Sequence, residues 1–140
     1  MNVILGGGER GAHLGQSLQD SLELADDVGC MLASDPVAAQ FCAFGVAQTS
    51  ATESALAEFM AEIKRIRDTE VDSAECIAAK AVLAQDLQRK MAEPLASAEL
   101  ALNLARHGLP QDFYTSYLEK LETVTPQDIR RVAQNMLKPN

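Results

Sequence analysis

Hydrophobic residues alternate with other residues in two neighbouring runs in the first third of the chain. In DVGCMLASD, Val28, Cys30 and Leu32 fall on one side of an extended strand, and an Asp-Pro pair ends the run. The next run, AQFCAFGVAQT, is rich in Phe and Val, which favour strands. Since only a short loop separates the two runs, we predict an antiparallel hairpin over about residues 27–49.

The rest of the chain has helical spacing. Before the hairpin, Leu14, Leu18 and Leu22 share one face of a helix predicted over about residues 9–24. After Thr49 the helical pattern continues in five segments. Their predicted boundaries are a capping-box spacing at residues 50–53, an acidic start at Asp72, a break near Ala92 before Pro94, a left-handed end at Gly108, a start at Pro110 and a capped start at Thr125-Pro126.

These elements predict an α+β fold, in which a small antiparallel sheet packs against five or six helices. Of the 140 residues, 47% are hydrophobic but only 4% are aromatic, and the Ala and Leu content favours helix over strand. The length is typical of one domain with its own core. We therefore treat residues 1–140 as a single domain.

Charge and composition argue against several classes of protein. The net charge is −8, which argues against a surface that follows the phosphates of a nucleic acid. No apolar run approaches the roughly 20 residues that cross a bilayer, so we expect a soluble protein of the cytoplasm or periplasm, with no membrane partner. Cys30, Cys42 and Cys76 are too few and too widely spaced for a disulfide framework, and we expect them to pack as small buried side chains.

The glycines near the N-terminus satisfy a dinucleotide-binding motif. Gly6, Gly8 and Gly11 have the spacing G-x-G-x-x-G after a short apolar run, and this motif needs a strand-to-helix turn in a βαβ unit. Asp35 could serve as the acidic residue of that site, but no later run supplies another parallel strand. A dinucleotide-binding module is thus the alternative. The other interpretation is that Gly6, Gly7 and Gly8 let the first helix begin in close contact with the sheet.

The sequence predicts no catalytic residue and no metal site. Its two histidines, His13 and His107, form no H-E-x-x-H or H-x-x-E-H pair that would place two ligands on one helix face. We expect His13 on a helix flank and His107 at a helix C-terminus, both with structural roles. No G-x-S-x-G turn and no Cys-His pair close in sequence indicates a nucleophile.

Four stretches in a fixed order carry a resemblance to a known family. They are NVILGGG, SLQDSLELADDVGCMLAS, DSAECIAAKAVLAQDL and YLEKLETVTPQDIRRVAQNMLKP. Together they resemble the insulinase/pitrilysin-type zinc peptidases, which include the mitochondrial processing peptidases. The likeness is to the latter part of that family's second, non-zinc half-domain. It covers nearly all of the chain, and the closing stretch is its most specific part.

This resemblance implies the non-catalytic C-terminal domain of a zinc metallopeptidase. In the family, two half-domains enclose a chamber, and the first holds zinc through an inverted motif. The present chain would form chamber wall and support the binding of a peptide substrate. Its partner would be the N-terminal half-domain of the same protein, and zinc would lie in that half alone. Residues 1–140 would then be a fragment of a larger two-half peptidase.

Two positions depart from the family pattern. The second half-domain often supplies an Arg and a Tyr that reach the substrate near the zinc, and the matching positions here are Gln19 and Asp26. Asp26 would bring a negative charge where a phenol should stabilise a developing oxyanion. The alternative within the family is therefore an inactive scaffold or processing subunit.

A sheet of only two strands is marginal and has exposed edges. We expect further strands from a longer chain, which we favour, or a homodimer through the exposed strand edge. A rival from another class is a stand-alone helical interaction protein, which would fold as a monomer and bind a protein partner.

Overall fold

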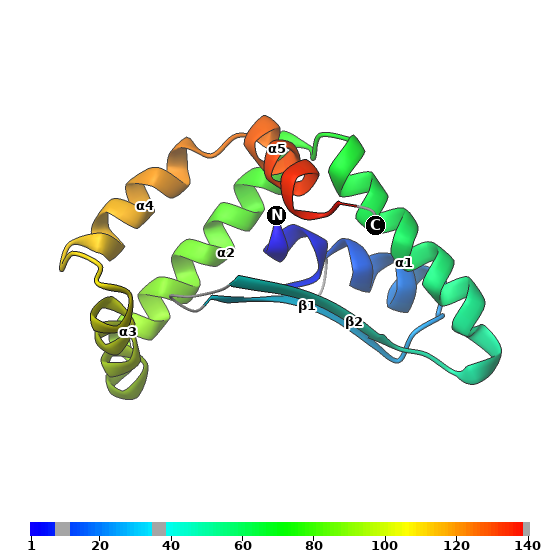
Figure 1. Ribbon diagram of the computed structural model, residues 1–140, viewed down its shortest axis with the longest axis horizontal. Coiled ribbons are helices and arrows are strands. Elements are labelled where there is room, and N and C mark those ends of the chain that lie inside the picture. The colour runs from blue at the N-terminus through cyan, green and yellow to red at the C-terminus, as the bar shows by residue number, and fades with distance from the viewer. Residues whose placement is uncertain (8–11, 35–38, 139–140) are drawn as a thin grey trace.

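The computed structural model describes residues 1–7, 12–34 and 39–138. The elements form an arch in which a β-hairpin crosses the middle, with α1 on one side and α2, α3 and α4 on the other (Figure 1). Strand β1 (Asp27–Ser34) pairs antiparallel with β2 (Ala39–Val46), so that Asp27 lies opposite Val46. The predicted hairpin is confirmed.

Helices make up most of the remaining chain. They are the π-helical segments η1 (Val3–Gly7) and η2 (Gly15–Ser21), the 3₁₀ turn η3 (Thr49–Ala51), and α1 (Thr52–Asp68), α2 (Ser73–Ala92), α3 (Pro94–His107), α4 (Phe113–Thr123) and α5 (Pro126–Met136). With the hairpin they confirm the α+β class.

Several predicted helix boundaries are confirmed because a specific side chain or backbone conformation determines each one. Asp72 accepts a hydrogen bond from the backbone of Ala74 and caps α2. Thr125 and Asp128 form a reciprocal capping box at α5, and Gly108 ends α3 with a φ of 61°. At Asp128, hydrogen bonds from Thr125 and Arg131 hold the pKa of the carboxyl group below its ordinary value.

Three other boundaries differ from the prediction. The helix predicted to start at Pro110 begins three residues later, at Phe113. The helix α1 begins after η3 at Thr52, and its N-cap position has no side-chain hydrogen bond, so the capping box at residues 50–53 is wrong. The helix predicted to reach Leu24 ends earlier, at Ser21, because Glu23 has a left-handed φ of 50°. The beginning of that predicted helix, residues 9–11, lies outside the described residues.

The left-handed Glu23 predicts a stabilising substitution. Because a side chain in this region costs roughly 1–2 kcal/mol and glycine adopts it freely, Glu23→Gly should raise the free energy of unfolding by about 0.5–1 kcal/mol. Asp20→Gly, three positions earlier in η2, is the matched control, and it should be destabilising. Urea unfolding monitored by circular dichroism measures both. A loss of stability in Glu23→Gly would contradict this account of the turn.

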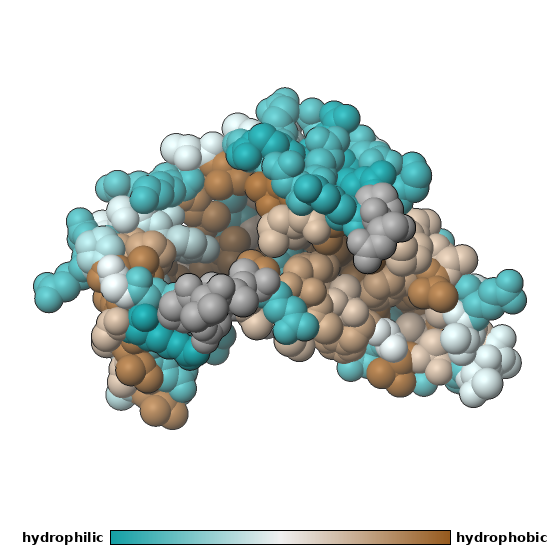
Figure 2. Space-filling view, viewed as in Figure 1, coloured by the Kyte–Doolittle hydropathy of each residue, from teal (hydrophilic) through white to brown (hydrophobic). Residues whose placement is uncertain are grey.

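The core lies between the inner face of the hairpin, the N-terminal segments, α1 and α5. Its most deeply buried side chains are Leu5, Leu14, Leu18 and Ile66. On the hairpin, the inner-face residues Val28, Cys30, Phe41 and Ala43 pack on or within this core, whereas the outer face exposes Met31, Phe44 and Val46. Hydrophobic residues also line a hollow between α4, α5 and the hairpin (Figure 2).

The burial of the two hairpin cysteines depends on the face of the sheet that each one occupies. Cys30 and Cys76 are buried, as predicted, but Cys42 is exposed. Cys42 lies opposite Met31 in the antiparallel register, and directly opposed residues share one face of a sheet, here the outer one. The prediction that all three cysteines are buried is therefore wrong for Cys42.

Candidate functional site

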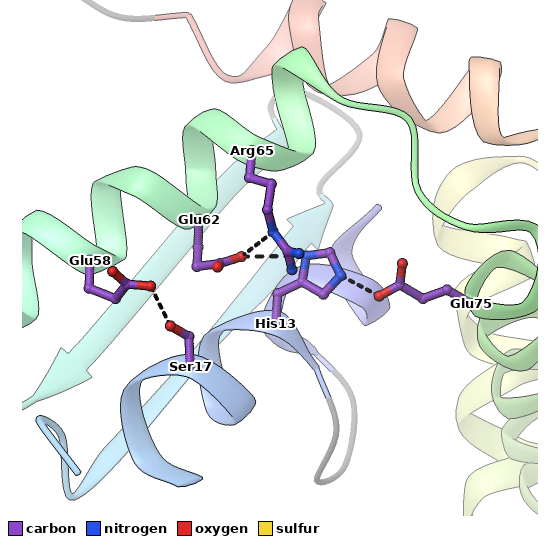
Figure 3. Close-up of polar contacts among 6 residues, drawn as sticks. All are labelled: His13, Ser17, Glu58, Glu62, Arg65 and Glu75. Carbon is purple, nitrogen blue, oxygen red and sulfur yellow. Dashed lines mark hydrogen bonds and ion pairs between the residues drawn. The ribbon is translucent and has the colours of Figure 1, made fainter. Parts of the chain in front are cut away.

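A buried histidine joins three helical elements through polar contacts (Figure 3). His13, just before η2, is only 5% exposed. Its Nε2 forms a hydrogen bond with Glu75 on α2, and its Nδ1 lies 3.6 Å from a carboxylate oxygen of Glu62 on α1. The same oxygen of Glu62 accepts a hydrogen bond of 2.9 Å from Arg65 Nε. One turn further along η2, Ser17 donates to Glu58 of α1.

This cluster has a structural role, since its contacts connect three helical elements. His13 Nδ1 is buried and has no hydrogen-bond partner, so the ring faces Glu62 without bonding to it. No group of three His, Cys, Asp or Glu side chains within the described ranges could hold a metal ion. The cluster therefore links η2, α1 and α2. Sequence reasoning missed it, because Glu75 is 62 positions from His13 and no local motif connects them.

The buried cysteine of β1 is held as a thiol. Cys30 Sγ donates to Asn2 Oδ1 at 3.0 Å. Burial raises the pKa of the Cys30 thiol to about 11, so that it stays protonated at neutral pH. Because the thiolate is the nucleophilic form, Cys30 is not suited to nucleophilic catalysis.

The two positions that depart from the family pattern lie side by side. Gln19 Nε2 donates to the backbone oxygen of Asp26 at 3.0 Å, between the end of η2 and the start of β1. The Asp26 side chain is exposed. Next to it, the Asp26 amide donates to Val46 O at 2.7 Å, which extends the pairing of the hairpin beyond β1. Gln19 and Asp26 are thus neighbours at the open end of the hairpin.

The hairpin has one free edge. Strand β1 contacts η1 and η2 as well as β2, whereas β2 makes extensive contacts only with β1 among the elements of the described chain. An uncovered strand presents unpaired backbone N–H and C=O groups, which can pair with another extended chain. Within the described residues the second edge of β2 is therefore unpaired, and a further strand of the same protein or another extended chain could pair with it.

A pocket of about 380 Å³ lies between the hairpin and α1, and we call it the β2–α1 pocket. Ala43, Phe44 and Gly45 of β2 form one side, and Leu56 and Phe59 of α1 form the opposite side. Every other lining residue is apolar except Thr52. In Figure 2 the molecular surface over the hairpin and the middle of α1 is mainly hydrophobic.

The dinucleotide alternative is wrong for the structure as described. Val3–Gly7, which would have to include the first strand and the turn, is helical. The sheet formed by β1 and β2 is antiparallel, whereas the motif requires a parallel βαβ unit. Gly8 and Gly11 lie outside the described residues. Gly6 packs directly against the backbone of β1, where an added Cβ would lie 3.2 Å from Cys30 N.

A further observation concerns membranes. Within residues 1–7, 12–34 and 39–138, every helix is too short or too polar to span a bilayer.

Comparison with known proteins identifies the fold. No protein-family model and no curated protein sequence matches the chain. Among solved structures, a protease from Helicobacter pylori aligns with 98% of this chain at a TM-score of 0.83 and 20% identity, over 33% of its own length. The M16 peptidase inactive domain from Pseudomonas fluorescens aligns with 98% of the chain at a TM-score of 0.83 and 16% identity, over 32% of its own length.

These matches confirm the resemblance at the level of the fold. The chain spans about a third of the length of both solved structures. It has the fold of the M16 peptidase inactive domain, in the form of a partial half-domain.

Proposed function

We propose that this chain is part of the non-catalytic half of an M16-type zinc peptidase, where it forms chamber wall and supports the binding of an extended peptide. The observation that carries the proposal is the match of 98% of the chain to a domain described as inactive. The zinc would be held by the other half-domain, which would also be the physical partner of this chain. In this proposal, residues 1–140 are one segment of a longer two-half protein.

The free edge of β2 supports a role in peptide binding. A peptide that adds to an exposed strand gains affinity from backbone hydrogen bonds, whatever its side chains. Among the described residues β2 pairs only with β1, so a third strand of the sheet could come from a bound peptide or from another part of the longer chain. A third strand would also relieve the marginal stability of a two-stranded sheet.

Hydrogen exchange tests this role directly. The peptide Ser-Thr-Ser-Leu-Ser-Thr-Ser, added at up to about 1 mM, should slow amide exchange in residues 39–46 and leave the exposed helix α3 unchanged. Protection confined to other elements, or none at all, would overturn the proposal that β2 binds peptide.

An inactive scaffold of the same fold is the second candidate. The side chains at Gln19 and Asp26 favour it, because these two neighbouring positions carry neither the guanidinium nor the phenol that the family often places there. The two candidates differ in one readout, which is zinc-dependent hydrolysis of a peptide by the full-length protein. Turnover would favour the peptidase, and peptide binding without turnover would favour the scaffold.

A further inference from the structure

We propose that α3 and α4 together form a hinged arm, which opens from α2 as one unit while the rest of the fold stays intact. We call residues 94–123 the α3–α4 arm. Its opening is independent of the proposed function, because it depends only on contacts within this chain.

The arm lies outside the hydrophobic core. In the described part of the chain, every core residue, and every partly buried residue packed against the core, lies before Lys80 or after Thr123. The part of α2 that faces the arm is therefore outside the core as well. Ala79 and Val124 are the last residues on either side that touch the core. A segment without core contacts can open at a lower free-energy cost than the whole domain.

Little apolar burial holds the arm closed. Its only buried residue is Leu121, in a segment that the structure describes throughout. The helix α3 buries none of its residues, and Leu95 and Leu102 are 70% and 67% exposed. The two helices form one end of the arch, and among the described elements their extensive contacts are with α2 (Figure 1). Since apolar burial is the main stabilising contribution, the closed arm is only weakly stabilised.

The arm is joined better within itself than to α2. The Tyr114 hydroxyl of α4 donates to Leu100 O of α3 at 3.3 Å and accepts from Asn103 Nδ2 at 3.2 Å. A pocket of about 270 Å³ lies where α2, α3 and α4 meet, and Leu87 and Tyr117 are part of its lining. Empty space of this kind removes packing contacts between the arm and α2. The two helices of the arm should therefore move together.

Single extended residues connect the arm to the chain at both ends. Glu93, between α2 and α3, has φ −93° and ψ 124°. Val124, after α4, has φ −63° and ψ 133°. Residues at the ends of helices can absorb the backbone rotation of a hinge. The arm can thus leave α2 while the flanking helices keep their own hydrogen bonds.

The tyrosines provide a probe that is specific for the arm. The chain has no Trp, and its two tyrosines, Tyr114 and Tyr117, both lie in α4 at the pocket. Tyrosine fluorescence in a urea titration therefore follows the arm, and hydrogen exchange in β1 and α5 follows the core. The tyrosine transition should occur at a lower urea concentration than the loss of protection in the core. Without urea, amides of α3 and α4 should exchange at least about a hundredfold faster than those of β1.

A matched pair of variants separates the two units. Leu87 and Ile129 are each 6% exposed, but Leu87 faces the arm and Ile129 belongs to the core. Leu87→Ala should lower the midpoint of the tyrosine transition and leave the core transition in place. Ile129→Ala should lower the core transition and leave the tyrosine transition in place.

The wild-type comparison decides the proposal even if a variant does not fold. A single transition shared by the tyrosines, β1 and α5 would overturn the arm as a separate unit. Early loss of protection in α3 while α4 keeps the stability of the core would also overturn it, because α3 would then be fraying alone. Equal shifts of both transitions in Leu87→Ala would contradict the separation of the arm from the core.

Discussion

Replacement of His13 by alanine is expected to lower the free energy of unfolding by about 3 kcal/mol. The ring is buried, and its Nε2 is bonded to Glu75. Removing it leaves a cavity and takes away a partner of Glu75, and losses of this kind cost about 2–5 kcal/mol. The nearby Glu62 keeps its hydrogen bond with Arg65, which limits the total loss.

The control is the second histidine. His107 is the last residue of α3, where it is partly exposed, and His107→Ala should cost less than about 0.5 kcal/mol. A double-mutant cycle with Glu75→Gln should show a coupling of about 1–2 kcal/mol, because the two residues are in contact. Chemical denaturation of the four proteins of the cycle and of His107→Ala gives these values. Equal costs for His13→Ala and His107→Ala would contradict the assignment of the cluster as the tie between η2, α1 and α2.

Replacement of Gly6 by alanine is expected to cost about 2 kcal/mol. A Cβ at Gly6 would lie 2.9 Å from Leu14 Cδ1, 3.2 Å from Cys30 N and 3.3 Å from Gly29 C. Two of these atoms are backbone atoms of β1, and Leu14 is fully buried, so the helical turn η1 would have to move away from the strand. Overpacking of this kind costs about 1–3 kcal/mol.

Gly15→Ala is the matched control for this prediction. It also adds one methyl group to a glycine in a helical segment, but its Cβ would meet only Gln19 Oε1 at 3.4 Å. Because alanine is the better helix former by about 1 kcal/mol, Gly15→Ala should be neutral or stabilising. Urea unfolding compares the two variants. A stable Gly6→Ala protein would contradict the close packing of η1 on β1.

Local patterns predicted the parts of the fold that depend on neighbouring residues. The alternation in β1 and β2 has a period of two, which only a strand produces, and the hairpin followed from the short loop. The ends of α2 and α3 were predictable because Pro94 cannot continue a helix and Gly108 adopts a left-handed conformation. The start of α5 was predictable from the Thr125 and Asp128 side chains.

The features that escaped prediction depend on distant residues or on strained backbone. The contact between His13 and Glu75 joins residues 62 positions apart, and no periodicity reports such a pair. The early end of η2 depends on Glu23, whose side chain gives no signal of a left-handed backbone. The exposure of Cys42 follows from its register opposite Met31, and the sequence predicted the two strands of the hairpin without their register.

Part of the candidate site was predictable from the sequence and part was not. The resemblance pointed to Gln19 and Asp26, and these residues lie together at the open end of the sheet. The β2–α1 pocket was not predictable, because it forms between β2 and α1, which carry no shared motif. The small residues that line the pocket, such as Ala43 and Ala55, are common in any strand or helix and give no signal of a pocket.

The size of the protein in its source cells tests the central claim most directly. Antibodies raised against residues 1–140 would isolate the native product, and intact mass spectrometry would measure it. Because the chain spans about a third of the solved structures with this fold, the account predicts a polypeptide roughly three times as long as these 140 residues. A native product of 140 residues would contradict the role as one wall of a two-half peptidase and would favour a stand-alone interaction protein.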